Sequence, residues 1–104
     1  MARKSGNYLE FEWDGGNRTK NWVKHKVKIR ETEETFLDSK ALISEDPNHS
    51  KVEFRWLLLG KTARVRKLAV VFTRRTNKIR VVSARPMNKK ERRLYERQKN
   101  VKDS

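Results

Sequence analysis

The chain contains no cysteine, and this absence excludes several classes of protein. Disulfide frameworks, zinc sites built from thiolates and enzymes with a cysteine nucleophile all require that residue. Long apolar runs are missing as well, because the longest one covers only residues 68–72. Such a run is too short for a membrane span or for the core of a signal peptide. These absences predict a cytoplasmic protein without a membrane association.

Histidine and glycine are scarce, and neither occurs in a catalytic motif. His25 and His49 are the only histidines and form no His-Glu-x-x-His pair, so a zinc site built from histidine has little support. Gly15 and Gly16 lack the Gly-x-Gly-x-x-Gly pattern, and no Gly-Lys-Ser/Thr follows them, which argues against nucleotide-triphosphate hydrolysis. We therefore expect no cofactor and no metal.

Basic residues, in contrast, are abundant and unevenly distributed. The 104 residues include 27 Lys and Arg against 13 Asp and Glu, which gives a formal net charge of +14. Residues 1–50 hold nine basic and nine acidic residues, whereas residues 51–104 hold eighteen and four. Such a surplus indicates either phosphate binding by counterion release or an acidic protein partner. A generally solvated basic surface is the plainer alternative.

The length of the chain predicts a single domain with a small core. Only 35% of the residues are hydrophobic, but three Trp, four Phe and two Tyr provide dense packing material. We expect a flexible N-terminus over residues 1–7, one domain over residues 8–98 and a disordered tail over residues 99–104.

Hydrophobic periodicity in the first half predicts one strand and two short helices. Residues 8–14 alternate in the manner of a half-buried strand. Asn17 is suited to cap a first helix, in which Trp22 and His25 fall on one stripe. A second helix is expected over residues 31–37, where acidic residues suit the positive end of the helix dipole.

The second half predicts a sheet followed by a helix. Asn88 lies three residues before Glu91, which is the spacing of a capping box and marks the start of a C-terminal helix. Apolar alternation and turn residues indicate strands over residues 41–44, 52–59, 65–73 and 79–84. The predicted fold is therefore a small α+β domain, with an N-terminal strand, two short helices, an antiparallel sheet of about four strands and a C-terminal helix.

An acidic row along the first strand is one candidate for chemistry. Glu10, Glu12 and Asp14 alternate along the strand and, with Glu45 or Asp46, could hold the cations of a two-metal nuclease. A row of this kind is more typical of the solvated face of a strand.

The basic positions are more informative, because some occur where solubility does not require them. The helix dipole disfavours Lys89 and Lys90 in a first turn, and Arg80 lies within an otherwise apolar strand. We expect the cationic side chains of the later strands and the final helix to converge on one concave surface. The alternative for each is snorkelling or an ion pair, for instance with Glu91 or Glu96.

Two further residues carry alternatives of their own. His25 could titrate near neutral pH, with Lys24 beside it to hold a phosphate, or it could be a core histidine stacked on Trp22. Tyr95 could place its hydroxyl in a cleft, or it could be a packing residue of the last helix.

Several segments, taken in order, resemble the BrnT toxins of bacterial type II toxin–antitoxin systems. The resemblance covers roughly residues 8–98. The segments that carry it are Phe11-Glu12-Trp13-Asp14, Lys24-His25-x-Val27, Ala41-Leu42, Glu45-Asp46-Pro47-x-His49-Ser50, Leu59-Gly60-x-Thr62, Val70-Val71-Phe72-Thr73, Ile79-Arg80-Val81-Val82-Ser83-Ala84-Arg85 and Glu91-Arg92-Arg93-x-Tyr95-Glu96. Lys26 replaces a glycine that is common in the family after the Lys-His pair.

The resemblance implies a RelE-like α+β toxin that acts as a metal-independent endoribonuclease and arrests translation. It also implies a BrnA-like antitoxin that wraps the toxin in a heterotetramer and binds operator DNA through its own DNA-binding part. A homodimer of the toxin stays open. In such enzymes the RNA 2′-hydroxyl attacks the adjacent phosphate, and basic side chains stabilise the negative charge that develops.

On this basis the expected catalytic residues are Arg64, Arg80, Arg85, His25 and Tyr95, the arginines as phosphate and transition-state contacts and His25 or Tyr95 as the proton-transfer group. The expected RNA-binding residues are Lys24, Arg66, Lys89, Lys90 and Arg92. A non-catalytic basic module that binds RNA or the ribosome is the main alternative, and a metal-dependent nuclease is a weaker one.

Overall fold

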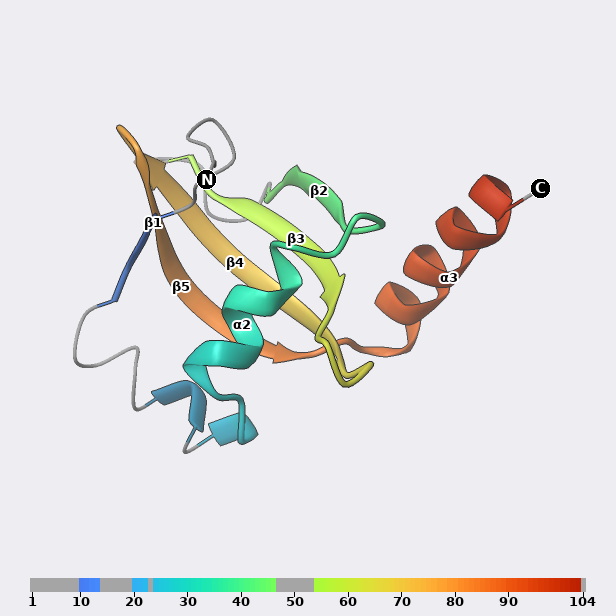
Figure 1. Ribbon diagram of the computed structural model, residues 1–104, viewed down its shortest axis with the longest axis horizontal. Coiled ribbons are helices and arrows are strands. Elements are labelled where there is room, and N and C mark those ends of the chain that lie inside the picture. Colours follow the sequence, from blue (N-terminus) through green and yellow to red (C-terminus); the bar gives the residue numbers. More distant parts are fainter. Residues whose placement is uncertain (1–9, 14–19, 23, 47–53, 104) are drawn as a thin grey trace, which may run out of the picture.

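The computed structural model describes residues 10–13, 20–22, 24–46 and 54–103. Five strands form one sheet in the order β1-β5-β4-β3-β2, and two helices flank it (Figure 1). The elements are β1 (Glu10–Glu12), α2 (Ile29–Thr35), β2 (Leu42–Glu45), β3 (Trp56–Lys61), β4 (Lys67–Arg75), β5 (Lys78–Pro86) and α3 (Lys89–Asp103). Residues 20–22 and 24–25 are also helical. No described helix is both long and apolar enough to cross a membrane.

The sheet is mixed rather than purely antiparallel. Strands β2 to β5 form the antiparallel meander that the sequence predicts. The expectation of about four antiparallel strands is incomplete, because β1 adds a fifth strand that runs parallel to β5 and places Phe11 beside Ile79. A parallel neighbour needs a long crossover connection, and the pairing of strands so distant in sequence leaves no local signal.

One face of the sheet carries the main core beneath α2. Phe36 follows the last turn of α2 and packs edge-to-face between two rings, with centroids 5.1 Å from Phe11 and 5.0 Å from Phe72. The buried members of this core are Val27, Leu58, Leu68, Val70, Phe72, Val81 and Ala84. Helix α2 begins and ends two residues earlier than predicted, so Leu37 lies beyond it and is 76% exposed.

The first helical segment differs from the prediction in the face that it buries. Trp22, on the expected stripe, is 45% exposed, whereas Asn21 is buried. The Asn21 side-chain oxygen accepts a hydrogen bond of 3.1 Å from the Ala84 backbone N–H of β5. A polar residue therefore ties this segment to the sheet. The predicted cap, Asn17, lies outside the described residues.

The opposite face is covered by the first turns of α3. Met87 and Tyr95 are buried there against Leu59 and Ala69, and the rest of α3 extends away from the sheet (Figure 1). The predicted capping box is confirmed, because the Glu91 N–H donates to Asn88 Oδ1 at 2.8 Å and the Asn88 N–H donates to Glu91 Oε1 at 2.9 Å. The helix continues past residue 98, and the expected division of the chain stays a prediction.

We predict that Gly60→Ala destabilises the fold by about 1–3 kcal/mol, because overpacking a filled core has a cost of this size. A Cβ at this buried position of β3 would lie 2.8 Å from Leu58 Cδ2 and 2.9 Å from the Thr35 carbonyl oxygen. Urea unfolding measures the loss as a lower midpoint at unchanged slope. Leu37→Ala is the control and should change the free energy of unfolding by less than about 0.5 kcal/mol. An unchanged midpoint in Gly60→Ala would contradict the close packing of α2 on β3.

Candidate nucleic-acid interface

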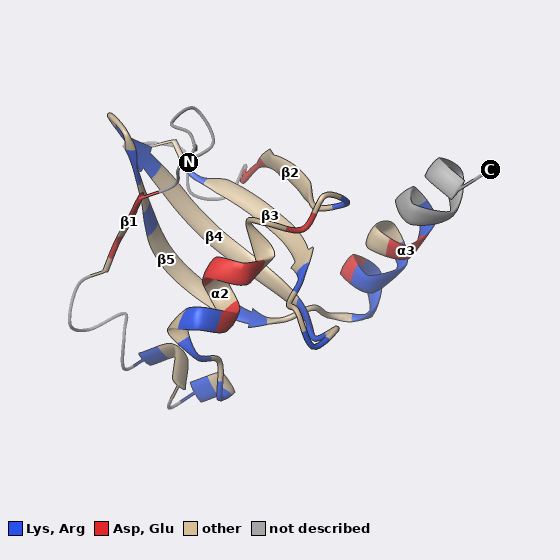
Figure 2. Ribbon diagram, in the orientation of Figure 1, with Lys and Arg blue, Asp and Glu red and all other residues tan. Residues whose placement is uncertain are grey.

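Lysine and arginine occur at the β4–β5 turn and, on a larger number of segments, at the other end of the sheet (Figure 2). The helical segment over residues 20–25, the β3–β4 turn and the connection from β5 to α3 all reach this end (Figure 1). We call it the basic end and define it by Lys24, Arg64, Arg66, Lys67, Arg85, Lys89, Lys90 and Arg92. The basic end contains seven of the ten site residues that the sequence predicts. The other three are Arg80, His25 and Tyr95.

Arg66 holds the loop before α2 against the β3–β4 turn. Its Nη1 donates to the Lys26 carbonyl oxygen at 2.7 Å and to Glu31 Oε1 at 3.1 Å, and its Nη2 donates to the His25 carbonyl oxygen at 2.9 Å. Lys26 has φ 54°, a left-handed conformation that favours glycine. Arg66 thus has the contacts that keep this strained loop in place, and Glu31 neutralises much of its charge.

The β3–β4 turn presents Arg64 to solvent. The Arg66 N–H donates to Thr62 Oγ1 at 3.0 Å, and the Ala63 N–H donates to Glu34 Oε1 at 3.0 Å, so both the turn and its attachment to α2 are fixed. Val65 has φ 70°, which is an outlier for a β-branched residue. Within the described residues, exposed Arg64 pairs with no carboxylate.

Arg85 forms the ion pair with Glu91 that the sequence left open as an alternative. Its Nη1 and Nη2 each lie 2.8 Å from a carboxylate oxygen of Glu91. The hydrogen bonds from Arg85, together with one from the Asn88 N–H, lower the pKa of Glu91 despite its burial. The same pairing raises the pKa of Arg85. This bidentate contact fixes the first turn of α3 on the end of β5.

Tyr95 anchors α3 to the loop after α2. The side chain is fully buried, and its hydroxyl donates to Asp38 Oδ2 at 2.6 Å. Asp38 also accepts hydrogen bonds from the backbone N–H groups of Lys40 and Lys61, at 3.0 and 2.9 Å. Burial and the Asp38 carboxylate raise the pKa of Tyr95. Burial opposes ionisation of Asp38, but the bonds from Tyr95, Lys40 and Lys61 lower its pKa overall. Tyr95 therefore keeps its proton at neutral pH.

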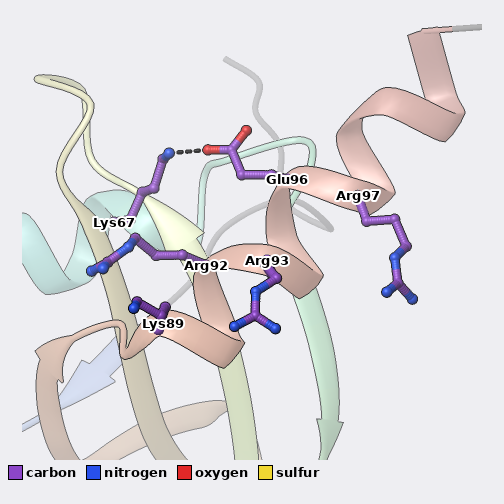
Figure 3. Close-up of a pocket in the computed structure, with 6 residues that line it drawn as sticks. All are labelled: Lys67, Lys89, Arg92, Arg93, Glu96 and Arg97. Atoms are coloured by element: carbon purple, nitrogen blue, oxygen red, sulfur yellow. Dashed lines mark hydrogen bonds and ion pairs between the residues drawn. The ribbon is translucent and has the colours of Figure 1, made fainter.

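A hollow of about 460 Å³ lies between the start of β4 and α3. Five basic side chains and one carboxylate line it: Lys67, Lys89, Arg92, Arg93, Glu96 and Arg97 (Figure 3). Glu96 pairs with Lys67, and Arg92 Nη1 donates to the Met87 carbonyl oxygen at 3.0 Å. The prediction did not include Arg93 and Arg97, although their spacing of four residues places them on one face of a helix.

The expected single surface is wrong for Arg80. In the β4–β5 register, Arg85 lies opposite Ala69 near the start of β4, whereas Arg80 lies opposite Thr73 near its end. The two arginines are five positions apart along the strand, which corresponds to roughly 16 Å. His25 precedes α2, its side chain is half-buried, and its carbonyl oxygen accepts a hydrogen bond from Arg66.

The acidic row of β1 faces basic residues. Glu10 lies beside Lys78 and Glu12 beside Arg80 in the parallel register, and both glutamates are exposed. Asp14 lies outside the described residues. In the part of the chain that the structure describes, no three His, Asp or Glu side chains form a group able to hold a metal ion.

Comparison with known proteins identifies a family whose sequence profile matches most of this chain. The sequence profile of the family described as "Ribonuclease toxin, BrnT, of type II toxin-antitoxin system" matches residues 13–91. Among solved structures, the ribonuclease toxin BrnT of Brucella abortus is similar to this chain with a TM-score of 0.59 at 20% sequence identity. The match covers 79% of this chain and 100% of that one, and it confirms the predicted fold. No curated protein matches this chain.

We predict that Glu91→Gln lowers the free energy of unfolding at neutral pH by about 1–2 kcal/mol, because it removes a charge-assisted pair that is only partly exposed. Glutamine still serves the capping box, so the change isolates the contact with Arg85. Since the native pKa of Glu91 is lowered, its contribution is present above the unfolded pKa and is lost as the pH falls through the acid range.

Chemical unfolding at neutral pH and at about pH 3 checks this sign. The difference between the native protein and Glu91→Gln should shrink on acidification. The matched control is Glu96→Gln, because Glu96 also pairs with a cation but its side chain is 41% exposed against 12% for Glu91. An equal loss at both pH values would show that Glu91 does not act through its charge.

Proposed function

This chain belongs to the BrnT family of ribonuclease toxins of type II toxin–antitoxin systems, and from that membership we propose that it is a cytoplasmic, metal-independent endoribonuclease that arrests translation. The observation that carries the proposal is the hollow beside α3, where five cations surround a space of about 460 Å³ with a single carboxylate. A polyanion is the ligand that such a surface favours, because it releases counterions on binding.

The reaction that we propose needs no metal ion. The RNA 2′-hydroxyl loses a proton and attacks the adjacent phosphorus, the bond to the 5′-oxygen of the next nucleotide breaks, and that oxygen takes up a proton. Negative charge grows on the phosphate oxygens in the transition state. Positioned guanidinium and ammonium groups lower the barrier, because they interact more strongly with the transition state than with the substrate.

We assign the phosphate contacts to the basic end. Arg64, Lys89 and Lys90 are exposed, and within the described residues none of them pairs with a carboxylate. Arg85 contributes from its pair with Glu91, because 37% of its side chain stays exposed and a guanidinium has more N–H donors than one carboxylate uses. Arg66, Arg92 and Lys24 add to the positive field, and Arg80 contacts RNA that extends along the sheet.

His25 is our candidate for proton transfer. Its side chain is half-buried at the basic end, and Arg66 fixes its backbone. Imidazole is suited to accept and donate protons near neutral pH. Tyr95 is less suited, because its hydroxyl is buried and already donates to Asp38. We therefore assign Tyr95 a positioning role, in which it holds α3 and its cations in place.

The proposed partner is a BrnA-like antitoxin that covers the basic end with an acidic surface and forms a heterotetramer with the toxin. In this complex the antitoxin supplies the operator-binding part. The unpaired cations support this proposal, since complementary charge speeds association and suppresses binding to other partners. The same charges would serve a non-catalytic RNA-binding module, so only the chemistry distinguishes that alternative.

We predict that the purified protein cleaves single-stranded RNA in excess chelator. Binding without strand scission would instead indicate a non-catalytic module, and loss of cleavage on chelation with recovery in Mg²⁺ would indicate a metal-dependent nuclease. Gel analysis of end-labelled RNA measures all three outcomes. Arg64→Ala should slow cleavage by about 10²–10³, the loss typical of one transition-state donor. Lys78→Ala, which removes an exposed charge at the other end of the sheet, should cleave normally.

We also predict that His25→Asn and Tyr95→Phe have opposite consequences. His25→Asn should slow cleavage by about 10²–10⁴ and abolish one limb of the pH–rate profile, with little loss of stability. Tyr95→Phe should leave the pH–rate profile unchanged but lower the free energy of unfolding by about 1.5–3 kcal/mol, because it removes a buried hydrogen bond to the Asp38 carboxylate. A changed pH–rate profile in Tyr95→Phe would instead show that Tyr95 takes part in proton transfer.

A further inference from the structure

A second hollow lies at the opposite end of the sheet from the basic end. Phe54, Trp56, Arg74 and Thr76 line a space of about 350 Å³. Phe54 is 61% exposed, and its ring lies 6.2 Å from that of Trp56 at an angle of 46° between the planes. Two aromatic rings and a guanidinium thus border one open site. None of its residues belongs to the proposed cleavage machinery.

The strand pattern explains why these side chains meet. Trp56 is the first residue of β3 and lies opposite Phe72 of β4, so one side of its ring packs on the core. Arg74 follows Phe72 by two residues and therefore shares its face of the sheet. Helix α2 covers the middle of this face and leaves the start of β3 beyond it (Figure 1). The Trp56 ring is held by the sheet, the Phe54 ring lies two residues before it, and the site that they border reaches solvent.

The charges around this site are asymmetric. Within the described residues, exposed Arg74 pairs with no carboxylate. Glu45 of β2 lies opposite Trp56 on the other side. A phosphate near the rings is therefore attracted toward Arg74 and repelled from the β2 edge. The site offers a flat π surface for a base and a cation for the phosphate that follows it.

We propose that Phe54, Trp56 and Arg74 form a stacking platform for an unpaired base of single-stranded RNA, remote from the site of cleavage. The inference rests on the proposed function, because it takes RNA as the ligand of the basic end. Aromatic rings stack on every base, so the platform binds without sequence preference. It retains long RNA across the sheet and contributes nothing to an oligonucleotide too short to reach both ends.

A base fits this site better than an apolar protein side chain does. The site is open rather than a closed apolar groove, and it combines π faces with a guanidinium, which is the usual composition of surfaces that bind single strands. The +14 net charge further favours a polyanion. An apolar anchor from a protein partner is the competing occupant, and it differs in one testable respect. Such an anchor needs apolar area but no π face.

Two substitutions at Phe54 separate these occupants. Phe54→Trp keeps a ring, whereas Phe54→Leu keeps apolar bulk without one. Phe54 precedes β3 and is exposed, so neither change disturbs the core. The probe is a dye-labelled oligodeoxynucleotide of about 16 residues, within the size range that single-strand sites cover. It lacks the attacking hydroxyl and stays intact during a fluorescence anisotropy titration. Leu37→Ala, another exposed apolar position, is the control.

We expect Phe54→Leu to bind about fivefold to a hundredfold more weakly, which is the loss that stacking of one base predicts. Phe54→Trp and Leu37→Ala should bind as the native protein does, and a trinucleotide should not distinguish the variants. Equal affinity of Phe54→Leu and native protein would overturn the platform, and it would do so even if the native protein cleaves RNA in chelator. If the native protein neither binds nor cleaves RNA, the proposed function fails together with the platform.

Discussion

The arrangement of the basic end depends on three ion pairs, in which a glutamate holds one of its lysine or arginine side chains in place. Glu31 holds Arg66, Glu91 holds Arg85 and Glu96 holds Lys67, and each pair joins segments that are distant in sequence or differ in structure. Each pair costs desolvation, so its gain in stability is modest. Its larger effect is positional, because the paired cations become fixed supports. The cations left without a carboxylate then project into solvent, where a ligand can reach them.

Helix α3 is also held by a small number of specific contacts, and these position its basic side chains. Tyr95 of α3 and Met87, which precedes the helix, are buried against the sheet, and the Tyr95 hydroxyl donates to a carboxylate that also accepts hydrogen bonds from two backbone N–H groups. Hydrogen bonds to a charged acceptor in a partly buried site are among the stronger ones. These contacts fix the start of α3 on the sheet. The basic side chains of α3 are thereby presented from a helix whose start is anchored by a small hydrophobic core and the hydrogen bond from Tyr95.

The elements that depend on residues close together in the chain could be predicted from hydrophobic alternation and residue spacing. Alternation found the meander from β2 to β5, and the spacing of Asn88 and Glu91 found the start of α3. The parallel partner of β5 and the buried Asn21 depend on contacts across the chain, which leave no periodicity. For the site, sequence chemistry found the cations but not their partners, because the choice between a free arginine and an ion pair depends on which carboxylate the fold brings near. Lys26, which stands where glycine is common in the family, adopts φ 54°, a conformation that the sequence did not predict.

The large positive charge of the protein also affects its stability. A net charge of +14 on 104 residues destabilises the compact state by self-repulsion, and the exposed cations of the basic end that pair with no described carboxylate contribute to it. Any polyanion that binds the native state relieves that repulsion and stabilises the fold by mass action. If the proposed antitoxin covers the basic end with acidic side chains, RNA and the antitoxin compete for the same electrostatic gain. In that arrangement the antitoxin inhibits RNA binding by occupying these cations and does not need to contact the atoms that react.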